Sequence, residues 1–194
     1  MQNIEHDFKK YDKYFITQDF DGDDKKIFLD KIERVLRSGI KIIQFRSKNL
    51  SIDQYSEMSK NIFELCKYYN STYIINDYKN YNKNKYCDGL QFTSKNLRHY
   101  HTFSKIKDIF LLGSCHNFEE IDICNSNNFH MITVSPVKNT RNKTGIGWDK
   151  FKNLSRHANA PVFALGGLDY NHDINIAIQN GASGIAASSY FYKL

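Results

Sequence analysis

The sequence of 194 residues contains no apolar run close to the roughly 20 residues needed to cross a bilayer. Its N-terminus, MQNIEHDFKKYDKYF, lacks the apolar region and the small-residue cleavage site of a secretory signal. The four cysteines, Cys66, Cys87, Cys115 and Cys124, include no C-x-x-C pair and suggest no disulfide framework. These absences predict a cytoplasmic protein with reduced thiols and no membrane partner.

Long runs of one charge are also missing. The formal net charge is +6, yet no run of Lys and Arg is longer than two residues. A basic surface can attract nucleic acid or small anionic molecules. The dispersed charges favour an ordinary solvated surface over a nucleic-acid-binding stripe, so we expect no nucleic-acid partner.

Segments typical of buried strands alternate along the chain with segments that have helical spacing of apolar residues. The expected strands span residues 14–19, 40–47, 71–77, 88–93, 109–115, 129–136, 161–168 and 183–190. The expected helices span residues 25–39, 51–70, 148–158 and 172–181, with an Asn-capped segment at 117–124. Eight such units predict an α/β fold, a closed parallel (β/α)₈ TIM barrel forming one domain over residues 1–194. An open doubly wound sheet is the alternative, and the eighth helix should be short or absent.

Polar residues gather where the expected strands end, which is where a TIM barrel builds its active site. Gln44, Arg46 and Lys48 alternate with period two and therefore share one face of the second strand. Buried donors on that face need an anionic partner, because an unpaired buried cation is costly. The partner is either Asp19 or Asp77 in an ion pair, or a phosphate group bound by the Arg46 guanidinium through two hydrogen bonds.

The stretch PVFALGGL, residues 161–168, places two of the chain's 10 glycines side by side at the end of the seventh strand. Gly166 and Gly167 fit a tight turn. They also fit a phosphate site, because TIM barrels often bind phosphate with backbone amides after strands seven and eight. Ser188 and Ser189 at the neighbouring strand end favour the phosphate interpretation.

Eight sequence blocks carry a resemblance that covers nearly the whole chain. In order, they read YFITQD, QFRSK, IIND, DGLQFTSKNL, GSCHNFEE, TVSPVKNT, PVFALGGL and NGASGIAASS. This ordered set resembles the thiamine phosphate synthase/TenI superfamily. It is most similar to the thiamine-phosphate-synthase-like domain that is often fused to Nudix hydrolases.

The resemblance implies a transferase of thiamine biosynthesis that couples hydroxymethylpyrimidine diphosphate with thiazole phosphate, releases pyrophosphate and uses Mg²⁺. Its partners would be these small phosphorylated substrates, and a homo-oligomer is left open. The implied roles, by position, are these: Gln44, Arg46, Lys48 and Asn76 on the diphosphate; Asp77 and Asn96 at the metal; Ser114 near the diphosphate or pyrimidine; Thr140 and Lys143 on a covering loop; Gly166, Gly167, Ser188 and Ser189 on the thiazole phosphate.

Three positions depart from the synthase pattern. Asn96 stands where the pattern has a second magnesium carboxylate, Asn142 replaces a hydroxyl residue, and Gln91 replaces a histidine. Two alternatives follow. One is a TenI-type thiazole tautomerase with His116 as the acid/base group, a role that suits histidine near neutral pH. The other is a non-catalytic protein that binds phosphate ligands, and His116 could also be a solvated residue at a helix start.

Overall fold

The computed structural model describes residues 7–20, 22, 24–76, 81, 86–102 and 109–193. Eight parallel strands form a closed barrel in chain order, with β8 pairing back onto β1. The barrel confirms the predicted fold class and overturns the open-sheet alternative. The strands are β1 (Lys13–Ile16), β2 (Ile42–Phe45), β3 (Thr72–Asn76), β4 (Gly89–Phe92), β5 (Phe110–Cys115), β6 (Met131–Val134), β7 (Val162–Leu165) and β8 (Gly184–Ala187).

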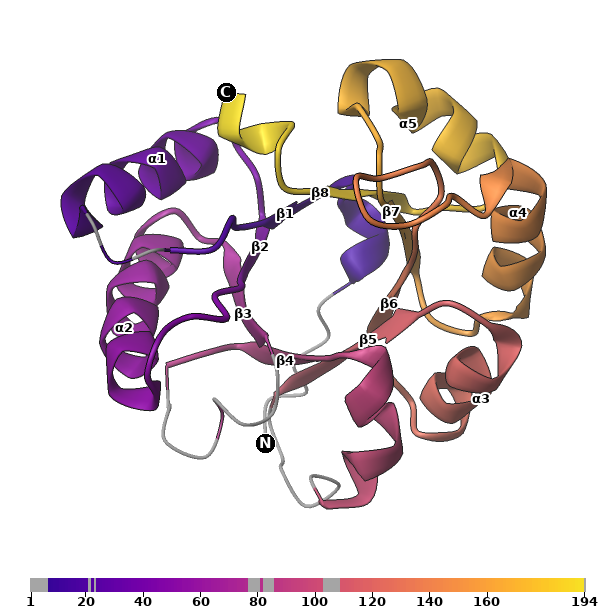
Figure 1. The fold of residues 1–194 in the computed structure, drawn as a ribbon, viewed down its shortest axis with the longest axis horizontal. Helices are drawn as coiled ribbons and strands as arrows, with labels where there is room; N and C mark the ends of the chain where they lie inside the picture. Colours follow the sequence, from indigo (N-terminus) through magenta and orange to yellow (C-terminus); the bar gives the residue numbers. More distant parts are fainter. Residues whose placement is uncertain are drawn as a thin grey trace.

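Helices surround the barrel (Figure 1). The α-helices are α1 (Lys25–Arg37), α2 (Ile52–Tyr68), α3 (Phe118–Ser126), α4 (Gly147–His157) and α5 (Tyr170–Gln179). The 3₁₀ helices among the described residues are η1 (Phe8–Lys10), η3 (Ser94–Thr102) and η4 (Phe191–Lys193). In the described part of the chain, no helix is long and apolar enough to cross a membrane.

Local sequence signals set the helix ends. Ser51 caps α2 in a reciprocal capping box with Gln54, and the side chain of Asn117 accepts a hydrogen bond at the start of α3. Gly39 follows α1 with a φ of 91°, a backbone conformation that glycine adopts without strain. α5 begins two residues earlier than predicted, because Asp169 caps it through the amides of Asn171 and His172.

Strand side chains alternate between the barrel interior and the surrounding helices. On β1, Tyr14 and Ile16 belong to the interior cluster, whereas Phe15 packs outward. Phe8 of η1 joins the interior cluster and places its ring 5.1 Å from that of Phe110, edge to face. This N-terminal packing is absent from the sequence prediction, because nothing local in the sequence links Phe8 to β5.

The observed strands are shorter than predicted, because their predicted ends become loops that carry polar side chains. After Ala187 the chain turns and forms the short 3₁₀ helix η4. Phe191 of η4 is buried against Phe15 and Tyr170. The shortened strands leave the carboxyl end of the barrel to the polar residues of the site.

Candidate active site

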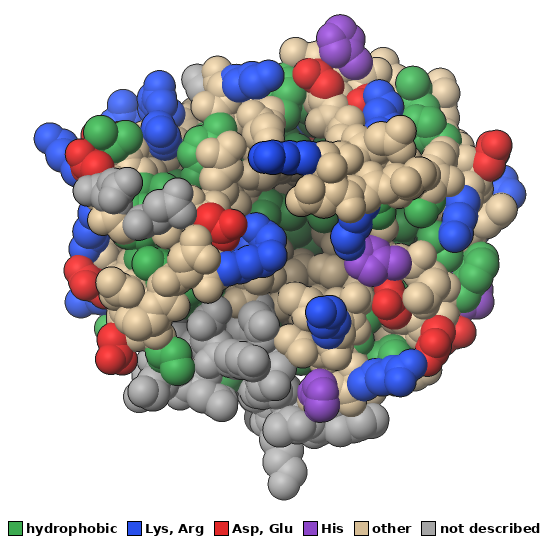
Figure 2. All heavy atoms as spheres, viewed as in Figure 1, with side chains coloured by type: hydrophobic (Ala, Val, Ile, Leu, Met, Phe, Trp, Pro, Cys, Tyr) green, Lys and Arg blue, Asp and Glu red, His purple; other side chains and the backbone are tan. Residues whose placement is uncertain are grey.

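A pocket of about 920 Å³ opens at the carboxyl ends of the strands. Figure 2 shows this face of the molecule hollowed near its middle, with Lys and Arg side chains on several sides. Most of the predicted site residues line the pocket together: Gln44, Arg46, Lys48, Asn76, Asn96, Ser114, His116, Thr140, Lys143, Gly166 and Ser188. Gly167 and Ser189 are exposed and do not line it. Asp77 lies outside the described residues.

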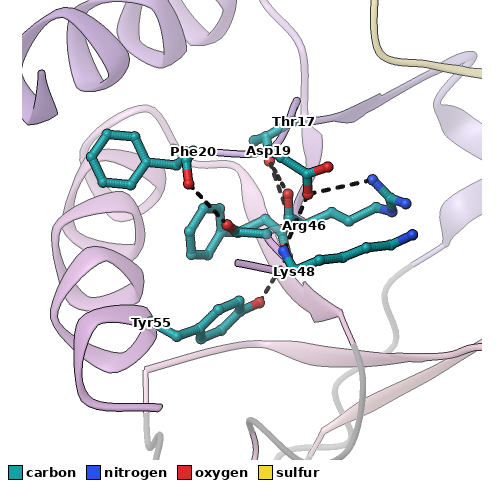
Figure 3. Close-up of polar contacts among 8 residues, drawn as sticks. Thr17, Asp19, Phe20, Arg46, Lys48 and Tyr55 are labelled. Atoms are coloured by element: carbon teal, nitrogen blue, oxygen red, sulfur yellow. Dashed lines mark hydrogen bonds and ion pairs between the residues drawn. The ribbon is translucent and has the colours of Figure 1, made fainter. Parts of the chain in front are cut away.

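Arg46 and Lys48 leave the end of β2 and extend in the same direction (Figure 3). The Arg46 guanidinium lies 3.6 Å from Asp19 Oδ1, and the Lys48 amide donates to the same oxygen at 3.1 Å. The Arg46 amide donates to Thr17 Oγ1 at 3.0 Å, which fixes the backbone of this segment. The ion pair with Asp19 considered in the sequence analysis is therefore present. It leaves Arg46 about one third exposed and within the pocket wall.

Four side chains from four strands form a hydrogen-bonded group at the base of the pocket, which we call the floor network: Tyr14, Gln44, Gln91 and Ser114. Gln44 Nε2 donates to Tyr14 Oη at 2.6 Å, and Tyr14 Oη donates to Gln91 Oε1 at 3.1 Å. Gln91 Nε2 donates to Ser114 Oγ at 3.0 Å. Burial raises the pKa of Tyr14 well above its usual range, so this hydroxyl stays protonated.

His116 lines the pocket just after β5. Its Nδ1 lies 2.5 Å from the carbonyl oxygen of Ser135, and a carbonyl can only accept, so Nδ1 carries the proton. Its backbone amide donates to Glu120 Oε2 at 2.5 Å. The ring is therefore held in one tautomer, and in the neutral form Nε2 is the remaining acceptor.

The glycine pair packs against the loop that joins β6 to α4. A Cβ at Gly166 would lie 2.6 Å from Pro136 Cβ, and a Cβ at Gly167 would lie 2.6 Å from the Asn139 carbonyl oxygen. Both residues also have positive φ, 102° and 69°. Close packing of residues 136–139 is thus sufficient to require glycine at both positions. A phosphate ligand at these amides stays a prediction.

The backbone amides of Gly166, Gly167, Ser188 and Ser189 donate no hydrogen bond to another described residue. Gly166 and Ser188 both line the pocket, at the ends of the neighbouring strands β7 and β8. Free amides at the edge of a pocket can bind an anion, because each supplies a hydrogen bond without a competing internal acceptor. This geometry is compatible with the predicted phosphate position.

The loop from β6 to α4 carries Thr140 and Lys143. The Thr140 amide donates to the Lys143 carbonyl at 2.9 Å, and the Lys143 amide returns a bond to Thr140 Oγ1 at 3.1 Å. Gly145 donates its amide to Asn139 Oδ1 at 2.8 Å. Hydrogen bonds therefore hold the loop in a defined shape with Thr140 and Lys143 in the pocket lining.

Magnesium requires oxygen ligands, of which carboxylates are the strongest. Among the described residues, no three His, Cys, Asp or Glu side chains lie together in a way that could hold a metal ion. Asn96 lines the pocket and offers only an uncharged amide oxygen, and the described carboxylate of the lining, Asp19, is engaged by Arg46. The described donors alone do not make a magnesium site, and Asp77, the other residue predicted at the metal, lies outside the described residues.

The structure adds pocket residues that the sequence analysis did not select. Lys95 follows β4 and lines the pocket, and it makes no ion pair with a described residue. Thr17, Gln18, Ser94 and Ser135 also contribute to the wall. The signal for Lys95 was its place beside Asn96 at a strand end. Among the described residues, the lining therefore has one carboxylate, Asp19, and four basic side chains: Arg46, Lys48, Lys95 and Lys143.

Two of the cysteines pack beside this site without entering it. Cys115 lies between Ser114 and His116, and its Sγ is 3.6 Å from Cys124 Sγ of α3. All four cysteines are free, as the sequence predicts. The contact with Cys124, together with burial, raises the pKa of the Cys115 thiol far above its usual range, so it is a packing group rather than a nucleophile.

Comparison with known proteins agrees with this arrangement. The family model described as thiamine monophosphate synthase matches residues 13–191. The chain belongs to this family. A thiamine-phosphate synthase from Prochlorococcus marinus (strain AS9601) is 32% identical over 189 residues, covering 93% of this chain and 51% of that protein.

Other members of the thiamine monophosphate synthase family match at similar levels. A thiamine-phosphate synthase from Methanococcus maripaludis is 27% identical over 189 residues, covering 94% of this chain and 87% of that protein. Among solved structures, a thiamine phosphate pyrophosphorylase from Pyrococcus furiosus superposes with a TM-score of 0.77 at 20% identity, covering 93% and 87% of the two chains. That structural likeness supports the fold of a thiamine monophosphate synthase.

Proposed function

We propose that this protein forms thiamine phosphate from hydroxymethylpyrimidine diphosphate and thiazole phosphate, with release of pyrophosphate. The observation that carries the proposal is the pocket of a thiamine monophosphate synthase family member, lined by Arg46, Lys48, Lys95 and Lys143 against a single described carboxylate. Such an excess of positive charge suits a leaving group that carries several negative charges.

In the proposed reaction, the bond between the pyrimidine methylene carbon and the diphosphate oxygen breaks, and pyrophosphate leaves with the electron pair. The thiazole nitrogen forms the new carbon–nitrogen bond. Arg46 and Lys48 from β2, with Lys143 from the β6–α4 loop, would neutralise the charge that develops on the leaving oxygens. The free amides at Gly166 and Ser188 would hold the thiazole phosphate.

The test is thiamine phosphate formation from the two substrates, measured with added Mg²⁺ and with EDTA. Product that depends on Mg²⁺ supports the synthase and indicates that a metal site forms although Asn96 provides no charge. If no product forms under either condition while thiazole phosphate still binds, the synthase proposal fails.

Arg46→Ala tests the anion site directly. We expect the Kd for inorganic pyrophosphate to rise roughly 10- to 100-fold, because a hydrogen bond to a charged group contributes about 1.5–3 kcal/mol. Arg37→Ala is the matched control, since Arg37 also pairs with a carboxylate, Glu33, but lies on α1 outside the pocket. Calorimetry measures this Kd. If Arg46→Ala and the wild type bind pyrophosphate with equal affinity, the role given to Arg46 is contradicted.

A second candidate, thiazole tautomerase, is favoured by one observation, the fixed tautomer of His116. With Nδ1 bound to Ser135, the ring could move a proton through Nε2. His116→Asn preserves a donor near the Nδ1 position and removes Nε2. Loss of thiazole isomerisation in this variant, in a protein without synthase turnover, would favour the tautomerase over a non-catalytic binder.

A further inference from the structure

The floor network is buried and closely connected. The exposed fractions of Tyr14, Gln44 and Gln91 are 0%, 3% and 1%. Buried polar groups are costly unless they are hydrogen-bonded, and each of these side chains bonds to another member of the network. Three rotatable polar groups are therefore held in one arrangement directly beneath the pocket.

The direction of these hydrogen bonds determines which donor and acceptor atoms are left free at the base of the pocket. Tyr14 has one hydroxyl proton, which it gives to Gln91 Oε1, and it accepts from Gln44 Nε2. With Oε1 occupied, Gln91 turns Nε2 toward Ser114 Oγ. Ser114 is thereby an acceptor within the network, and its own proton is donated to no described residue.

Gln44 is oriented by the same network. Its Nε2 also lies 3.3 Å from Gln91 Oε1, so the amide nitrogen faces two acceptors. Gln44 Oε1 is left without a partner among the described residues, and it is not a buried unpaired atom, so it is accessible from the pocket that Gln44 lines. The base of the pocket thus presents one free acceptor, on Gln44, and one free donor, on Ser114.

We propose that Gln91, held by Tyr14, is a positioning residue that fixes this donor and acceptor pair and so makes the pocket selective for an aminopyrimidine edge. The inference rests on the proposed function. An aminopyrimidine offers an amino donor beside a ring-nitrogen acceptor, which complements Gln44 Oε1 and the Ser114 hydroxyl. Gln91 does not line the pocket and acts only through its neighbours.

Gln91→Glu tests the direction of the network with little change in shape. A protonated carboxyl still has one O–H to donate toward Ser114, whereas an ionised carboxylate can only accept. Once ionised, it would take the Ser114 proton and remove the free donor. We expect the Kd ratio of variant to wild type for hydroxymethylpyrimidine diphosphate to rise about tenfold or more between about pH 5 and about pH 8.

Other titrating groups are shared by the two proteins and cancel in this ratio. Tyr14 is the titratable side chain within the network, and its raised pKa keeps it protonated over this range. Charged and titratable pocket residues are present in both proteins: Asp19, Arg46, Lys48, Lys95, His116 and Lys143. Inorganic pyrophosphate has no pyrimidine and meets only the added negative charge, so its ratio should rise less with pH than that of the pyrimidine diphosphate.

Two further variants keep the result interpretable. Gln18→Glu adds a carboxylate to the pocket wall outside the network, and we expect it to weaken pyrophosphate and the pyrimidine diphosphate together. Tyr14→Phe removes the partner shared by Gln44 and Gln91, and it should weaken only the pyrimidine ligand. If Gln91→Glu gives a pH-independent ratio, or weakens both ligands equally with a lower Tm, the positioning role is overturned.

The same measurements separate this inference from the proposed function. Absence of turnover in the wild type would refute the synthase, while a selective, pH-dependent loss of pyrimidine binding in Gln91→Glu would still support the positioning role. A wild-type protein that binds pyrophosphate but not the pyrimidine diphosphate would overturn both.

Discussion

Gly166 meets two separate constraints at one residue. Its φ of 102° lies in the region that side chains rarely adopt, and a Cβ would lie 2.6 Å from Pro136 Cβ. Gly39 has a similar φ of 91°, but a Cβ there would meet nothing within 4 Å. The two glycines therefore separate the cost of backbone conformation from the cost of close packing.

We expect Gly166→Ala to lower the free energy of unfolding by more than Gly39→Ala does. Backbone strain contributes about 1–3 kcal/mol at either position, and the contact with Pro136 adds to it only at Gly166. Urea unfolding of the two variants and the wild type measures the difference. Equal losses would show that the β6–α4 loop moves aside without cost.

The glycine pair also shows how far the sequence could describe the site. Its position after β7 was predictable from strand order, and so were Arg46 and Lys48 from their period-two spacing. That Gly166 and Gly167 contact residues 136–139 was not predictable, because this contact depends on the path of a loop some thirty residues earlier in the chain. Local patterns place residues at the pocket, but they do not show which residues contact one another there.

Among the secondary-structure elements, α3 packs against β5 where Gly113 leaves space for the side chain of Cys124. A Cβ at Gly113 would lie 2.5 Å from Cys124 Sγ, and Cys124 belongs to the buried cluster outside the barrel strands. β5 also carries Ser114 and the chain leading to His116, so this packing sets the position of two pocket residues. The sequence predicted the strand and the capped helix, but not the residue pair through which they pack.

Gly113→Ala should destabilise the protein by about 1–3 kcal/mol, because the added methyl group overpacks a filled layer. Adding Cys124→Ala removes the atom that the methyl group meets, so the double variant should recover much of the loss. Urea unfolding of the two single variants and the double variant gives the coupling. Cys66→Ala, a buried cysteine on α2, is the control and should add independently to Gly113→Ala. If the losses of unfolding free energy from Gly113→Ala and Cys124→Ala simply add in the double variant, the predicted clash between residues 113 and 124 is contradicted.

Over the whole molecule, the alternation of strands and helices was enough to predict a closed barrel, because eight parallel units at this length bury their apolar strands best in that form. The contacts that complete the barrel were not predictable. Phe8 fills the amino end of the interior, and the Tyr14–Gln91 bond joins residues 77 positions apart. Such contacts arise only after closure brings distant strands together.

The short helix η4 follows the last strand, and its Phe191 packs against the outer face of the barrel. Its ring is fully buried and lies 6.2 Å from Phe15 and 6.1 Å from Tyr170, which belong to β1 and α5. We expect Phe191→Ala to lower the free energy of unfolding by about 3–5 kcal/mol, the cost of truncating a buried aromatic side chain.

Calorimetric melting of Phe191→Ala beside Tyr68→Ala tests this account. Tyr68 is 82% exposed on α2, so its truncation should leave Tm nearly unchanged. Ser188 directly follows β8 and lines the pocket. Truncation of Phe191 should therefore weaken the binding of thiazole phosphate more than the binding of pyrophosphate at Arg46. A small Tm change for Phe191→Ala would mean that β1 and β8 hold the barrel closed through their backbone pairing alone.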